Sequence, residues 1–293
     1  MHIDNLKDSL RLRFEEIRKV HDAIHEFILI APAMFPCEGV SWHSKSAFLL
    51  YHWETFDSAH RSLIEALCGY YNVAFTLLRS VLELLLKGAF FECLAYRKFR
   101  ENSSQLDKDK GGRNLETFLN EITKQAPSVA DELERISASI YDKIALIVDN
   151  PKFRPRIKTI IKQLKDWEIL DPIPNADLYV WNLYQILSKD VHVIPDRTDI
   201  GKVLVLKPDE IFGRKKVHLA LLDEYMKYLK EVMDLGIVIE LNILKTSLRY
   251  REIRANIKEK IAVDNVTDLL ALGFSPKRSY IYRFLFSLRE KIF

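Results

Sequence analysis

The stretch VAFTLLRSVLELLLKGAFF at residues 73–91 decides the fold of this chain. It is apolar almost throughout, yet charged side chains recur at every fourth position. Drawn on a helix, six polar residues share one stripe about 100° wide: Asn72, Thr76, Arg79, Ser80, Glu83 and Lys87. The other faces carry leucine, valine, phenylalanine and alanine. We therefore predict the central helix of an all-α domain, packed on most sides and carrying one charged ridge.

The composition also favours helices in a globular protein. Of 293 residues, 48% are hydrophobic and 29% are charged, and only 9 are glycine, which is scarce. Abundant Leu, Ile, Lys and Glu are typical of helices. The three cysteines, Cys37, Cys68 and Cys93, show no paired spacing, which is typical of thiols in a reducing compartment. We expect a cytoplasmic protein.

A membrane location is excluded by the charges of the most apolar stretch. Three charges near the centre of residues 73–91 would cost about 2.5–3.5 kcal/mol each on insertion. The N-terminus is charged from its fourth residue, which is unlike a signal peptide.

Apolar periodicity and breaks by proline and glycine divide the chain into elements. Residues 69–72 are a tight connection that makes the second and third helices an antiparallel hairpin, with Asn72 as N-cap. Asn175 is a second expected cap. The only short β-hairpin expected lies near 203–219. Helices are predicted at about 1–31, 44–68, 72–100, 114–125, 129–148, 156–168, 175–189 and 218–247.

The first helix has a heptad seam, and this seam suggests a homodimer. Its members are spaced three and four apart, with one polar interruption at Arg13: Ile3, Leu6, Leu10, Arg13, Ile17, Val20, Ile24 and Phe27.

A second polar constellation lies in YQILSKDVH, where Tyr184, Ser188 and His192 are spaced four apart. On a continuous helix all three share one edge, where they could bind a phosphate or share a proton. The structural alternative is that Tyr184 packs its ring, Ser188 bonds a backbone carbonyl and His192 caps a helix end.

The order of these elements suggests relatives. A helix hairpin with LLRSVLELLLK, then Trp167, then Tyr-x-x-x-Ser-x-x-x-His followed by Pro195, resembles a prokaryotic domain-of-unknown-function family related to the HEPN superfamily. The resemblance covers roughly residues 45–240. It implies a helical, usually dimeric domain, and many HEPN proteins are metal-independent RNases of defence systems.

The resemblance implies roles for individual residues. His192 would act as general acid/base on a 2′-hydroxyl, Arg79 would stabilise phosphate charge, and Glu83 would orient the arginine, with Tyr184 and Ser188 in support. One departure matters: the HEPN nuclease signature has an arginine four to six residues before its histidine, and His192 follows Ser-Lys-Asp instead. Whether the chain is an enzyme therefore stays open.

Two histidine patterns are weaker candidates for metal sites. His21 and His25 are four apart on the first helix, but no third ligand is fixed by the sequence. Asp57-Ser-Ala-His60 is half of a di-iron pattern whose second half is missing. We expect no metal and no cofactor.

The C-terminal segment is basic. Residues 245–293 hold eleven Lys/Arg and five Asp/Glu, interleaved with aromatic residues. Arg278 and Arg283 are the candidate nucleic-acid contacts there, although the same helices could simply pack. We divide the chain into a helical domain, 1–246, and a basic helical appendage, 247–293.

Two functions remain open from the sequence. The first is a dimeric helical protein that binds or cleaves RNA or a nucleotide, in prokaryotic defence or stress. The second is a non-enzymatic dimeric scaffold in which arginine, glutamate and histidine form a structural polar network.

Overall fold

The computed structural model describes residues 10–34, 47–94, 99, 102, 155–189 and 219–247. In these ranges the chain forms helices and no strand, so the all-α prediction is confirmed. The helices are α2 (Phe14–Met34), α3 (Ala47–Leu67), α4 (Tyr71–Leu94), α9 (Ile157–Asp166), α10 (Ala176–Ser188) and α12 (Leu219–Ser247).

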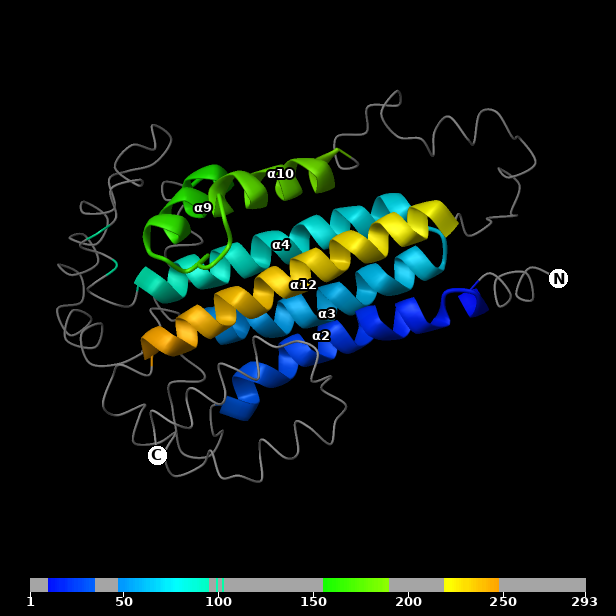
Figure 1. Cartoon of the computed structure of the whole chain (residues 1–293), viewed down its shortest axis with the longest axis horizontal. Coiled ribbons are helices and arrows are strands. Elements are labelled where there is room, and N and C mark those ends of the chain that lie inside the picture. Colours follow the sequence, from blue (N-terminus) through cyan, green and yellow to red (C-terminus); the bar gives the residue numbers. More distant parts are fainter. Residues whose placement is uncertain are drawn as a thin grey trace.

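Helix α4 lies at the centre, as its sequence predicts. It contacts α3 and α12 on one side and α9 and α10 on the other, while α2 packs against α3 and α12. Figure 1 shows α2, α3, α12 and α4 running side by side, with the shorter α9 and α10 laid along α4. A helix with neighbours on both sides has to be apolar on most faces, which explains residues 73–91.

The connection between α3 and α4 is a tight turn with a glycine in the left-handed region. Gly69 has φ 81°, its amide bonds the carbonyl of Ala66, and the amide of Tyr70 bonds that of Glu65. This pair of bonds closes the helix C-terminus. Helix α4 begins at Tyr71, two residues earlier than a cap at Asn72 would give, so Asn72 lies inside the helix and is not its N-cap.

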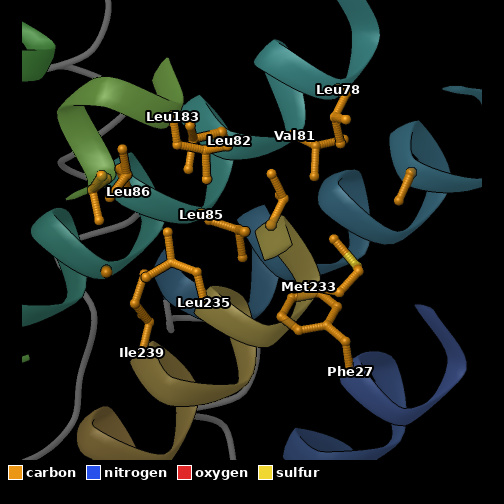
Figure 2. Packing of buried hydrophobic residues seen from close by; sticks show 14 of the residues in the cluster. Phe27, Leu78, Val81, Leu82, Leu85, Leu86, Leu183, Met233, Leu235 and Ile239 are labelled. Atoms are coloured by element: carbon orange, nitrogen blue, oxygen red, sulfur yellow. The ribbon is translucent and has the colours of Figure 1, made fainter. Parts of the chain in front are cut away.

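The core gathers around α4. Figure 2 shows Leu78, Val81, Leu82, Leu85 and Leu86 of α4 facing Leu183 of α10 and residues of α12. All of these leucines are at most 2% exposed. The charged ridge of α4 is the exception, because its side chains are exposed or half-buried. The predicted division into apolar faces and one polar stripe is confirmed.

Close helix contact depends on glycine at two positions. A Cβ added at Gly88 would lie 2.7 Å from the Cβ of Tyr51 on α3. A Cβ added at Gly236 of α12 would lie 3.0 Å from the ring of Phe27. These glycines let α3 approach α4, and α12 approach α2, without moving the backbone.

Residues of the heptad seam of the first helix pack against other helices of the same chain. Val20, Ile24 and Phe27 are buried against neighbouring helices. Arg13, the polar interruption, binds both carboxylate oxygens of Asp223 on α12, at 2.7 and 2.9 Å. These residues therefore need no second copy of the chain to be satisfied, and the homodimer stays a prediction.

The first helix differs from its prediction over 1–31, because a turn at Leu12 and Arg13 precedes α2, which begins at Phe14 and continues to Met34. The other elements agree with the sequence where the structure describes them. Helices α9, α10 and α12 lie within about two residues of their predicted bounds. Asn175 precedes α10 as expected, but its side chain forms no capping hydrogen bond. Within the described ranges, no helix combines the length and the apolarity needed to cross a bilayer.

Several predictions fall outside the described residues. They are the helices at 114–125 and 129–148, the β-hairpin near 203–219 except Leu219, and the basic appendage at 247–293 except Ser247. Leu219 and Ser247 belong to α12.

Candidate functional site

Arg79, Glu83 and Tyr184 meet between α4 and α10. Nη2 of Arg79 donates to the hydroxyl of Tyr184 at 2.8 Å and lies 2.9 Å from Oε1 of Glu83. The Tyr184 hydroxyl in turn donates to the same carboxylate oxygen at 3.2 Å. The sequence singled out all three residues, and the structure places them in one triangle. We call this triangle the Arg79 cluster.

The carboxylate of Glu83 is held by cations on both sides along α4. Its Oε2 accepts a hydrogen bond of 3.0 Å from Nζ of Lys87. Burial alone would raise the pKa of Glu83. The hydrogen bond and charge of Lys87, the charge of Arg79 and the Tyr184 hydroxyl together lower this pKa below its usual value. Glu83 is therefore a carboxylate at neutral pH.

The guanidinium of Arg79 is not fully paired among the described residues. Its Nη2 is engaged, but its buried Nε has no hydrogen-bond acceptor among the described residues. The side chain is 21% exposed, and its Cζ lies 5.1 Å from the centroid of the Tyr184 ring. An arginine held over an aromatic ring is fixed in place before any ligand arrives.

Two residues that the sequence did not assign to the site extend the cluster. The indole of Trp181 stacks on Tyr184, with centroids 5.5 Å apart and planes 21° from parallel. Nζ of Lys158, on α9, lies 5.2 Å from the centroid of the Trp181 ring. The i, i+3 spacing of Trp181 and Tyr184 could have indicated the stack. Nothing in the sequence indicated Lys158, because it lies on another helix.

Ser188 shows the structural behaviour considered for it. Its hydroxyl donates to the backbone carbonyl of Tyr184 at 2.6 Å, inside α10. Lys189 keeps helical backbone angles at the end of this helix. His192, Arg278 and Arg283 lie outside the described residues, so their distance from the Arg79 cluster stays a prediction.

A second polar cluster joins α2 to α3. Nε2 of His25 lies 3.2 Å from Nε2 of His21 and 3.3 Å from Nε2 of His60. The sequence indicated no third partner for the His21–His25 pair, and the structure places His60 there. Burial, and then the neighbouring histidines, lower the pKa of His25. Burial lowers the pKa of His60.

The carboxylate half of the di-iron pattern points elsewhere. Oδ2 of Asp57 pairs with Nε of Arg61 at 2.8 Å, both exposed on α3. The ring of His60 contacts the histidines of α2, whereas Asp57 pairs with Arg61. His60 and Asp57 therefore do not form a shared set of metal ligands.

No protein-family model, curated protein or solved structure matches this chain at a significant level.

Proposed function

We propose that this chain binds RNA or a nucleotide, and that the Arg79 cluster contacts a phosphate of that ligand. The observation that carries the proposal is the charge of the cluster together with its aromatic stack. Arg79, Lys87 and Lys158 supply three positive charges, against one carboxylate at Glu83. The excess of two positive charges favours an anionic ligand.

The aromatic side chains favour a nucleotide over a bare anion. Trp181 and Tyr184 stack on each other beside Arg79, and both are only half-buried. Partly exposed aromatic rings beside a guanidinium are typical contacts of a nucleotide, whose base stacks on a ring while its phosphate binds the cation. This combination is typical of contacts to single-stranded nucleic acids. The cations there bind the phosphates, and the rings stack on bases of any sequence.

The enzymatic form of the proposal adds His192. It follows Ser188 by four residues, so a helix continued past Lys189 would place it one turn beyond Ser188 on the same edge as Tyr184. An imidazole there would take the proton from a 2′-hydroxyl, which then attacks the adjacent phosphate and displaces the 5′-oxygen. The cations of the Arg79 cluster would stabilise the charge that develops on that phosphate.

One titration tests both forms. Fluorescein-labelled single-stranded RNA of mixed sequence is mixed with the full chain in EDTA, with anisotropy reporting binding and a denaturing gel reporting cleavage. We expect saturable binding by wild type. Cleavage by wild type that His192→Ala loses while still binding would establish a metal-independent RNase. Binding without cleavage would restrict the function to recognition, and absence of binding would overturn the proposal.

A second candidate function is the dimeric scaffold. The observation that favours it is that both oxygens of Glu83, and Nη2 of Arg79, already have partners within the chain. On this reading the cluster fastens α10 to α4 and binds nothing. Light scattering tests the dimer directly, because a monomer at micromolar concentration would contradict it.

A further inference from the structure

Three histidines from two helices point their ring nitrogens at one another. His21 and His25 are one turn apart on α2, and His60 reaches them from α3. One ring nitrogen of each residue lies within 4.8 Å of one from each of the other two. Such convergence is unusual for basic side chains, which ordinarily avoid one another when protonated.

The hydrogen bonding of His60 fixes which nitrogen faces the cluster. Its Nδ1 lies 3.1 Å from the backbone carbonyl of Phe56, an arrangement in which Nδ1 carries the hydrogen and donates it. In a neutral imidazole Nε2 is then left with a lone pair. A backbone carbonyl on the outer nitrogen is the usual way in which a metal-binding histidine is oriented.

Hydrogen bonds alone do not explain the two short contacts of His25. Nε2 of His25 lies between Nε2 of His21 and Nε2 of His60, at 3.2 and 3.3 Å. His25 can carry one hydrogen at this position, so it cannot make two good hydrogen bonds there. A cation held by three lone pairs satisfies all three nitrogens at once.

Two of the three nitrogen–nitrogen distances in the cluster match those around a tetrahedral ion. With zinc–nitrogen bonds of about 2.0–2.1 Å, two nitrogens at a tetrahedral centre lie about 3.3–3.4 Å apart. Both short contacts of His25 lie close to this value. The ring of Phe56 lines the cluster edge-on, with centroids 5.5 Å from His25 and 4.4 Å from His60. The apolar wall lowers the competition from water on that side.

We propose that His21, His25 and His60 form a site for a divalent zinc ion that links α2 to α3. Neutral imidazoles are ligands of borderline divalent ions, and zinc takes three of them in tetrahedral sites. The side chain of His21 is 47% exposed, so solvent reaches the cluster and a fourth ligand can come from it. The fourth position is open to a water molecule or a small anion. The site lies on α2 and α3, whereas the Arg79 cluster and the residues that extend it lie on α4, α9 and α10.

Calorimetric titration of the full chain with zinc chloride tests this proposal. The protein carries no polyhistidine tag and is stripped with EDTA and dialysed beforehand. We expect one equivalent of zinc with micromolar or tighter affinity, and a rise of Tm as the bound state is stabilised. His21→Ala, which removes an exposed side chain, should weaken binding by about tenfold or more. His60→Gln should do the same and remove the visible absorption of tetrahedral Co²⁺.

Asp57→Asn is the matched control, because it changes a neighbouring polar group on α3 and keeps all three imidazoles. It should bind zinc like wild type. The proposal is overturned if wild type shows no stoichiometric zinc binding in the micromolar range. It is equally overturned if folded His21→Ala and His60→Gln both bind zinc as tightly as wild type.

Discussion

Arg79 donates a hydrogen bond of 2.8 Å to the hydroxyl of Tyr184, a residue 105 positions further along the chain. The bond joins the charged ridge of α4 to the polar edge of α10. These are the two features that the sequence offered as a candidate site, and they are adjacent in space. The contact can therefore act on the stability of the fold, on the binding of a ligand, or on both.

Tyr184→Phe should lower the free energy of unfolding by about 1–2 kcal/mol. The change keeps the ring beneath Arg79 and removes only the hydroxyl. Arg79 and Glu83, which are partly buried, then each lose one hydrogen-bond partner. Urea denaturation measures the effect. Tyr179→Phe is the control on the same helix, because its hydroxyl makes an exposed bond of 3.3 Å to Glu231. That change should cost less than about 0.5 kcal/mol, and equal losses in the two variants would contradict the account.

Glu83→Gln should lower the Tm at neutral pH, and the difference in Tm from wild type should be smaller at acidic pH. The pKa of Glu83 is lowered by its cationic neighbours, so its contribution is present above the ordinary pKa of 4.5. It is lost as the pH falls through the lowered pKa, because the folded carboxylate is then protonated. Thermal unfolding from pH 7 to pH 3 should therefore show the Tm difference between wild type and variant narrowing. A constant difference across that range would show that the charge of Glu83 contributes nothing.

His52 should make the chain lose stability between pH 6.5 and pH 4. Burial lowers the pKa of this imidazole from 6.5 to about 4. Desolvation outweighs the hydrogen bond between Nε2 of His52 and the carbonyl of Ile28, which acts to raise the pKa. Glu240 lies 3.9 Å from Nδ1, too far for a hydrogen bond. The unfolded chain takes up a proton in this window and the folded chain does not, so stability is complete above pH 6.5 and falls below it.

The size of this loss is bounded by the pKa difference, at about 3 kcal/mol. His52→Gln removes the titrating group and should flatten that part of the pH profile, whatever its effect at pH 7. Urea midpoints at pH 7, 6, 5 and 4 measure it. An unchanged slope in the variant would assign the acid sensitivity to other groups.

Gly88→Ala should destabilise the chain by about 1–3 kcal/mol, because the added methyl meets the Cβ of Tyr51 at 2.7 Å. That atom cannot move without shifting α3. Ordinarily alanine in place of a helical glycine stabilises by about 1 kcal/mol, so the sign of the effect is diagnostic. Denaturant unfolding of the variant measures it, and a gain in stability would contradict the close approach of α3 and α4.

The sequence predicted the fold well because the decisive signals are local. Each signal can be read from residues that are close together in the sequence. These signals are the apolar faces of residues 73–91, the glycine at 69 and the apolar periodicity of α12. The cap expected at Asn72 puts the start of α4 two residues too late, because the turn at Gly69 already closes the preceding helix and lets α4 begin at Tyr71.

The sequence predicted which site residues lie together on one helix, but not which helices bring their residues into contact. Arg79 and Glu83 share a ridge, and Tyr184 and Ser188 share an edge, so each pair was visible as a spacing. That Tyr184 would meet Arg79 depends on how α10 lies across α4. Lys158 over Trp181, and His60 against His25, depend in the same way on contacts between helices, for which the sequence has no local signal.

Lys158→Gln is the most direct test of the proposed ligand site. Lys158 is exposed, contacts the ring of Trp181 and takes no part in the Arg79–Glu83–Tyr184 triangle, so its loss should leave Tm unchanged. Anisotropy titration of labelled single-stranded RNA at several salt concentrations compares it with wild type. The account predicts weaker binding and a salt dependence reduced by about one phosphate contact. RNA affinity and salt dependence equal to those of wild type would contradict it.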